Sequence, residues 1–238
     1  MNPLLLKEVQ TASSKFGAYY GLLDFRYKNL CVKADPFSLL PVTIQANLYE
    51  CNIEEVASVL TVDDFRMAIY PNDEMYLVEI SKGVLHAHPE FKQTLMLHTS
   101  DGEDQELNPD KLYDQSLKGV KYLIFTMPEV DKNRYDLLTN GVKSLHDECM
   151  SRVKVVNMQT KAQLTNGSFL STEKDIQEAE ARLKELYDKT VEQVDKLKDD
   201  KLDEIEEAYQ KYLEDHEVYE EPVPTFDVIR GMKFGETE

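Results

Sequence analysis

The sequence predicts an α+β fold, an antiparallel three-helix bundle into which a small α/β domain is inserted. Three observations predict it. Three long segments carry apolar side chains at helical spacing, strand-like alternation is confined to the stretch between the first two, and each long helix has a single apolar stripe. A long helix with one apolar stripe must bury it, and three such helices can cover each other as a bundle.

The first predicted helix covers residues 4–32. Its apolar residues recur at Leu5, Val9, Ala12, Phe16, Tyr20, Leu23, Tyr27 and Leu30. The Asp35–Pro36 pair follows it, and the residue before a proline disfavours helix, so the chain leaves the bundle there.

In the segment from 36 to 125 the apolar residues follow a different spacing. Residues 41–49 and 65–70 alternate apolar and polar side chains, residues 122–125 are a short apolar run, and all three are predicted strands. Residues 76–85 are predicted as a short helix and 98–114 as an acidic loop. We expect an inserted domain over 35–126, with the bundle formed by 1–34 and 127–214. The two chain crossings predict a hinge made by Ala34, Asp35, Pro36, Thr126 and Met127.

The second and third helices return to helical spacing. The second is predicted over 128–164, with an apolar stripe that includes Leu138, Val142 and Cys149, so that Cys149 is expected in the core. The third begins near Ser171 and runs for about 40 residues, roughly 60 Å. Residues 215–238 are predicted to be an acidic, extended tail.

The composition and the motifs of the chain limit the classes of function that we expect. The chain has 238 residues, a formal net charge of -18, and only three cysteines, which are far apart. No apolar run approaches the ~18 residues that cross a bilayer, and the cysteines fit a reducing compartment, so we expect a cytoplasmic monomer without membrane contact. Nucleotide-binding, hydrolase and metalloprotease motifs are absent. The triplet His86, His88 and His98 lacks a metal-ligand pattern. No enzymatic activity, cofactor or metal is expected.

The charge is unevenly distributed. Residues 171–238 carry -12, whereas 1–35 and 126–170 carry +2 and +1. On the second helix, Lys143, Lys154 and Lys161 fall within about 20° of one another, a row ~27 Å long that points away from the apolar stripe. Such a row is either an ordinary solvated face or a surface that follows an RNA backbone. Tyr19, Tyr20 and Tyr27 could stack on bases, but their helical spacing favours packing.

Several stretches, in order, resemble the ribosome recycling factors. They are Asp35 to Leu40 (DPFSLL), Val56 to Asp73 (VASVLTVDDFRMAIYPND), Glu79 to Lys82 (EISK), Pro128 to Arg134 (PEVDKNR), Leu170 to Glu173 (LSTE) and Leu183 to Ile205 in the last helix. The similarity extends over about residues 4–210. It implies an L-shaped pair of domains, a three-helix bundle and a β/α/β sandwich joined by a flexible hinge.

The resemblance also implies a function without an active site. Family members bind ribosomal RNA of the large ribosomal subunit and, with elongation factor G and GTP, dissociate post-termination ribosomes. Basic residues of the first two helices contact the RNA, and the positions that match them here are Lys33, Arg134 and Lys154.

Two alternatives stay open beside recycling. The chain could be a divergent paralogue that regulates ribosomes. It could also be a protein-interaction scaffold outside the ribosome that uses the acidic residues 171–238.

Overall fold

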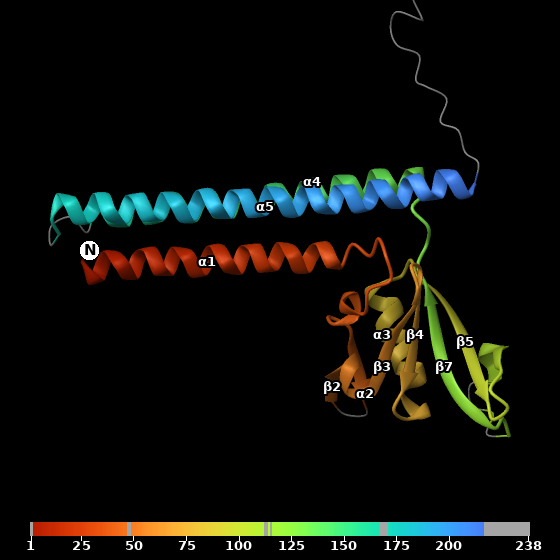
Figure 1. Ribbon diagram of the computed structural model, residues 1–238. Coiled ribbons are helices and arrows are strands. Elements are labelled where there is room, and N and C mark those ends of the chain that lie inside the picture. Colours follow the sequence, from red (N-terminus) through yellow and green to blue (C-terminus); the bar gives the residue numbers. More distant parts are fainter. Residues whose placement is uncertain (1, 47–48, 112–113, 115, 167–170, 217–238) are drawn as a thin grey trace, which may run out of the picture.

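The computed structural model shows an L-shaped molecule with a long helical arm and a mixed domain at one end (Figure 1). It describes residues 2–46, 49–111, 114, 116–166 and 171–216. The predicted fold class is confirmed. The predicted tail at 215–238 lies outside the described residues from position 217 onward.

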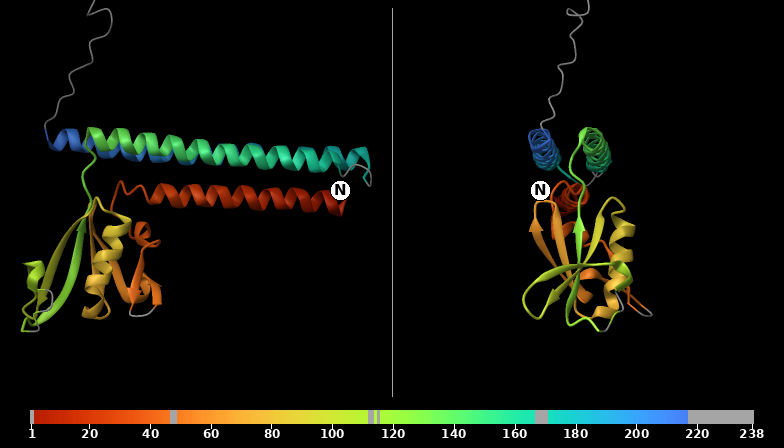
Figure 2. Two further views of the ribbon diagram at one scale, coloured as in Figure 1. Left: turned by 180° about the vertical axis from the view of Figure 1, so that it is seen from behind. Right: turned by 90° about the vertical axis from the view of Figure 1, so that its right-hand side faces the viewer.

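Three helices form the arm: α1 (Pro3–Lys28), α4 (Lys132–Asn166) and α5 (Glu173–Asp215). Seen end-on, they pack as a triangle in which α1 faces the inserted domain (Figure 2). The stripes predicted from the sequence meet in one core, where Leu5, Val142, Val153, Leu183 and Val194 are at most 2% exposed. Cys149 and Tyr27 are buried there as predicted, and Tyr19 and Tyr20 pack against this core.

Local chemistry sets the helix ends. Asn2 caps α1 by accepting a hydrogen bond from the Leu4 amide, and Thr172 caps α5 in the same way through the Asp175 amide. The predicted continuation of the first helix to residue 32 is wrong. Helix α1 ends at Lys28 with Asn29 as its C-cap, and Cys31 beyond it adopts φ 42°, in the left-handed region that a continuing helix excludes.

The inserted domain contains a hairpin, a five-stranded antiparallel sheet and helix α3 (Leu77–Ala87). The hairpin is β1 (Thr43–Ala46) with β2 (Tyr49–Asn52), followed by the short helix α2 (Ile53–Val56). The sheet has the order β3-β4-β7-β5-β6, with strands β3 (Ala57–Asp63), β4 (Arg66–Pro71), β7 (Gly119–Thr126), β5 (Lys92–Thr99) and β6 (Asp104–Leu107). Short 3₁₀ turns lie at Pro36–Leu39, Glu74–Tyr76 and Pro109–Lys111.

Two predictions for this domain are wrong. Residues 41–49 do not form one strand, because β1 and β2 fold back on each other with Thr43 opposite Asn52. Residues 98–114 are not a loop, since they include the end of β5 and all of β6. Strand β6 is at the sheet edge and is mostly exposed, so its acidic residues gave no apolar alternation.

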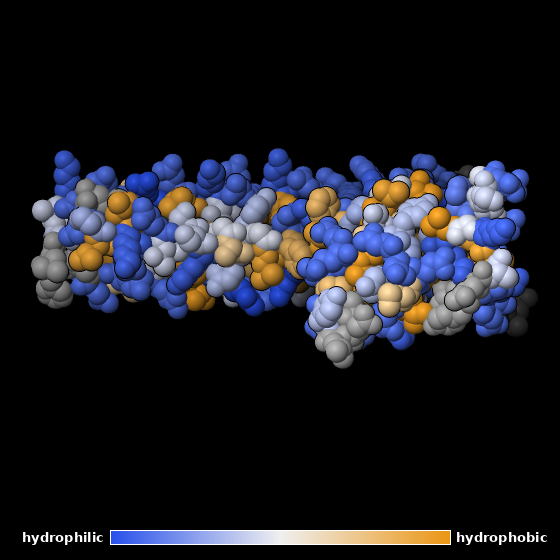
Figure 3. Space-filling model, turned by 90° about the horizontal axis from the view of Figure 1, so that it is seen from below, coloured by the Kyte–Doolittle hydropathy of each residue, from blue (hydrophilic) through white to orange (hydrophobic). Residues whose placement is uncertain are grey.

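One face of the sheet and α3 enclose a second core, in which Met67, Ile69, Ile80, Leu123 and Phe125 are almost completely buried. On the face seen from the inserted-domain side, apolar residues are scattered among hydrophilic ones (Figure 3). In the part of the chain that the structure describes, no helix is long and apolar enough to span a membrane.

Candidate RNA-binding surface and hinge

The three lysines of the predicted row are exposed along α4. Lys143, Lys154 and Lys161 make no ion pair with any described residue, while the buried side of the helix is formed by Leu138, Val142 and their stripe. Exposed ammonium groups that are not paired within the protein are available to phosphates. The row is interrupted on the same side by Asp147, whose side chain is 84% exposed.

Helix α5 places carboxylates beside α4. His146 Nε2 lies 2.8 Å from an oxygen of Asp195, which bridges the two helices, and Asp188, Glu192 and Asp199 share that side of α5 in a shallow hollow. These carboxylates do not cap the lysine row directly. Negative charge on a neighbouring helix opposes the binding of a polyanion, and salt screens this repulsion.

The other two predicted RNA contacts lie away from the row. Lys33 Nζ is 3.6 Å from Glu207 on α5, with its side chain about half exposed. Arg134 is partly buried, and its Nη2 donates to the Cys31 carbonyl at 3.0 Å. Its placement gives Arg134 a contact within the protein, and RNA binding by either residue stays a prediction.

The hinge is held by a two-residue turn between β3 and β4. The Ala34 amide donates to the Asp64 carbonyl at 2.7 Å, and the Met127 amide donates to the Phe65 carbonyl at 2.8 Å. Both chain crossings are therefore attached to the same turn. The bundle reaches this turn too, because Lys211 of α5 lies 3.0 Å from Asp64 Oδ2 and over the Phe65 ring.

The remaining predicted hinge residues have ordered partners. Asp35 Oδ1 accepts the Phe37 amide at 3.0 Å and begins the turn that contains Pro36. Thr126 is paired within the sheet, opposite Arg66 and Lys92. The assignment of these five residues as a flexible hinge stays a prediction.

Two contacts near the hinge, between Cys31 and His88 and between His88 and Phe91, were not predicted from the sequence. Cys31 is buried, and burial raises the pKa of its thiol to about 11. Its Sγ lies 3.7 Å from Nδ1 of His88, a buried residue at the end of α3 that stacks on Phe91. Desolvation lowers the pKa of Arg134, whose Nε is buried without a hydrogen-bond partner. No local pattern in the sequence indicated this cluster, because its contacts join residues 57 and 103 positions apart.

We expect Arg134→Met to destabilise the protein by about 1.5–3 kcal/mol, because a charged hydrogen bond to the Cys31 carbonyl is lost. Urea unfolding measures the effect. Arg152→Met is the matched control, since that arginine is exposed and its removal should cost about 1 kcal/mol or less. Equal losses in both variants would contradict a specific role for Arg134 at the hinge.

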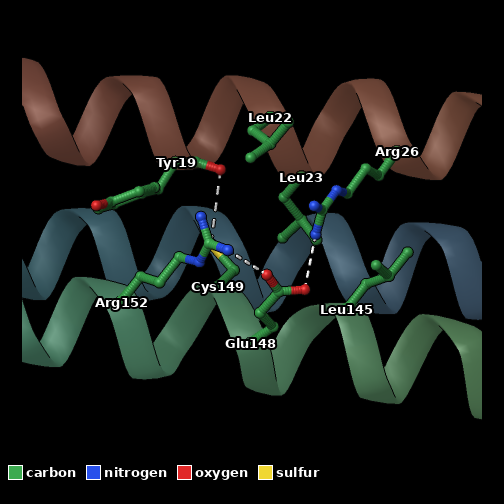
Figure 4. Close-up of a pocket in the computed structure, with 8 residues that line it drawn as sticks. All are labelled: Tyr19, Leu22, Leu23, Arg26, Leu145, Glu148, Cys149 and Arg152. Carbon is green, nitrogen blue, oxygen red and sulfur yellow. Dashed lines mark hydrogen bonds and ion pairs between the residues drawn. The ribbon is translucent and has the colours of Figure 1, made fainter.

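A second basic cluster joins α1 to α4 on the side away from the lysine row. Figure 4 shows Glu148 between Arg26 and Arg152, with Arg152 next to Tyr19. Arg26 Nη1 is 2.7 Å from Glu148, and the Arg152 guanidinium lies 5.8 Å from the centre of the Tyr19 ring. These arginines are engaged in helix packing, and we do not assign them to the RNA-binding surface.

This cluster predicts a pH dependence. The hydrogen bond from Arg26 lowers the pKa of Glu148, so the stabilisation is complete above the ordinary glutamate range of about 4.3 and is lost as the pH falls through the lowered pKa. The stability difference between wild type and Glu148→Gln should therefore shrink below about pH 4. Urea unfolding over that range measures it, and a pH-independent difference would rule the ion pair out as a contributor.

Comparison with known proteins gives a structural match but no sequence match. No protein-family model matches the chain, and no curated protein matches it in sequence. Its fold is similar to the solution structure of the ribosome recycling factor, with a TM-score of 0.64, 18% identity, and coverage of 87% of this chain and 100% of that chain. Models of the T. thermophilus ribosome recycling factor and E. coli elongation factor G bound to the E. coli post-termination complex also match, with a TM-score of 0.54, 18% identity, and coverage of 84% and 98%. The predicted resemblance is confirmed for the fold.

Proposed function

We propose that this chain, which has the fold of ribosome recycling factors, binds the large ribosomal subunit and helps elongation factor G to dissociate post-termination ribosomes. The observation that carries the proposal is the exposed row of Lys143, Lys154 and Lys161 on the arm of this two-domain fold. A matching structure is described as bound with elongation factor G to a post-termination complex. The proposal includes a cytoplasmic monomer that works by binding and has no catalytic residues.

Physical chemistry supports a binding role for the row. Three ammonium groups spaced along ~27 Å of helix can follow the phosphates of one RNA strand or groove. Lysine contacts phosphate as a point charge and does not distinguish one base from another. Because the contacts are electrostatic, the binding should depend on salt and not on RNA sequence. The hinge supports a role in ribosome dissociation. An inserted domain attached through two chain crossings can move relative to an arm that is bound to RNA.

The decisive experiment is a ribosome-splitting assay. Purified post-termination ribosomes are mixed with the chain, elongation factor G and GTP, and free subunits are followed by light scattering. The proposal expects splitting that requires all three components. If the chain co-sediments with large subunits but does not split ribosomes, it is a ribosome-associated regulator. If it does not bind large subunits even at low salt, the ribosomal function is wrong.

We expect Lys154→Glu to weaken co-sedimentation with large subunits by roughly tenfold, because one phosphate contact is replaced by a repulsive one. The effect should diminish as salt is raised. Lys189→Glu on α5 is the control, since it makes the same charge change at an exposed position outside the row. If both variants bind equally well, the row is an ordinary solvated face.

A second candidate function rests on the acidic surface of α5. The carboxylates of Asp188, Glu192, Asp195 and Asp199 share one side of that helix, and residues 171–238 carry a net charge of -12. Such a surface fits a basic protein partner. A scaffold of this kind would keep its partner in the absence of ribosomes, which distinguishes it from a recycling factor.

A further inference from the structure

Strand β3 is an open edge of the five-stranded sheet. It has seven residues, Ala57–Asp63, and among the strands that the structure describes it pairs only with β4. From Ser58 to Val62, no backbone hydrogen bond joins it to any other described segment. Leu60 and Val62 beside this edge are 55% and 47% exposed. Long edge strands with exposed apolar side chains invite pairing with another strand.

The opposite edge of the same sheet is protected. Strand β6 has four residues, and its first three, Asp104, Gln105 and Glu106, are exposed and polar. A short, charged edge strand discourages further pairing. Strand β3 has a bulge between Thr61 and Asp63 but no charge from Ala57 to Val62. The two edges therefore differ, and only β3 is suited to accept another strand.

The sequence beyond the described residues contains a candidate for that strand. In residues 225–234 (TFDVIRGMKF), four of the five even positions are apolar, Phe226, Val228, Met232 and Phe234, with Arg230 between them, whereas the odd positions other than Ile229 are polar or glycine. This period-two pattern is typical of a strand with one apolar face. In β3, the even positions Ser58 and Leu60 also point to one face of the sheet, and the exposed Val62 follows them in the bulge.

The geometry of the chain fixes a direction for the pairing. Strand β3 runs toward the hinge and ends at Asp63, next to the Asp64 carboxylate that binds Lys211 of α5. Helix α5 ends at Asp215, and His216 lies 3.4 Å from Glu129 at the same end of the molecule. A segment leaving α5 here and running back along β3 is antiparallel to it. Residues 217–224 can span at most about 28 Å, so they can act as the connection.

The charged residues of the two segments also favour the antiparallel direction. Residues 225–234 contain Arg230 and Lys233 against one acid, Asp227. In an antiparallel arrangement, Lys233 comes near the start of β3, where the exposed acids Glu54 and Glu55 of α2 precede the strand. Opposite charges at this position favour the antiparallel register.

We propose that residues 225–234 add to the open edge of β3 as a sixth, antiparallel strand, with Val228 and its apolar neighbours covering Leu60 and Val62. The strand completes the sheet from within the same chain. It protects β3 from pairing with a second molecule, and it attaches the end of α5 to the inserted domain across the hinge. This inference does not depend on the proposed ribosomal function.

Hydrogen–deuterium exchange of the full chain tests the proposal. Val228→Asp places a charge on the apolar face of the added strand, whereas Thr225→Asp places the same charge on the opposite face and is the matched control. We expect the outward-facing amides of residues 58–62 to exchange at least about tenfold faster in Val228→Asp than in wild type or Thr225→Asp. Exchange in β7, which is interior to the sheet, should be unchanged in all three.

Two outcomes would overturn the proposal. Equal exchange of β3 in the three proteins would mean that residues 225–234 do not pair with it. Protection of β3 that disappears on roughly hundredfold dilution would mean that a second copy covers the edge, because an intramolecular strand is insensitive to concentration.

Discussion

Charge reversal of Lys143, Lys154 and Lys161 together should weaken binding to large ribosomal subunits by on the order of a thousandfold at 0.1 M salt. Each substitution removes one ammonium group that can neutralise a phosphate and adds a carboxylate that repels it. The slope of log K against log salt should decrease by roughly two to three, because fewer counterions are released on binding. Co-sedimentation over a range of salt concentrations measures both quantities.

The control for this variant must carry the same net charge. Lys184, Lys189 and Lys196 are exposed on α5, so reversing them changes the charge of the protein equally while leaving the row intact. A specific surface predicts a small effect of this control, through long-range repulsion only. If the two triple variants lose equal affinity, total charge determines the binding and the row has no special role.

The helices could be predicted from the sequence because the pattern that indicates each helix lies within the residues of that helix. Each carries an apolar stripe with a period near 3.6, and burial of residues such as Leu183 and Val153 follows from that stripe alone. The lysine row could be predicted for the same reason, since the angle between positions on one helix needs no tertiary structure. The end of α1 was missed because the left-handed conformation of Cys31 has no signature in that residue type.

The sheet and the hinge depend on contacts between distant residues. Strand β6 looks like an acidic loop, because an exposed edge strand needs no apolar alternation. Lys121 is 2% exposed on β7 and lies 3.2 Å from Glu74, a pairing across 47 residues that no local pattern reveals. Arg134, which the family resemblance assigns to RNA, is placed by folding against the Cys31 carbonyl. The position of a residue along a helix predicts which face of the helix it lies on. Which residue it contacts there, and therefore what it does, depends on the tertiary structure.

Phe125→Ala should destabilise the inserted domain by about 3–5 kcal/mol, because its fully buried ring leaves a cavity between the sheet and α3. Phe125 lies on the central strand β7, opposite Met67 on one side and Gln93 on the other, and its ring is 0% exposed, so its removal leaves a void inside the core. The bundle has its own core, which does not include this residue. We therefore expect the sheet to unfold at lower urea concentration while the long helices persist.

The complementary variant is Leu183→Ala, which truncates a fully buried residue of α5. We expect it to lower the free energy of unfolding of the bundle by about 2–5 kcal/mol and to leave the sheet in place. Far-UV circular dichroism at the helical band follows the bundle, and hydrogen exchange of β7 follows the inserted domain. Opposite effects of the two variants would establish that the arm and the inserted domain are separate folding units, as the predicted boundaries require. A single shared transition in both variants would instead mean that the hinge contacts of Arg134 and Lys211 couple the two cores into one unit.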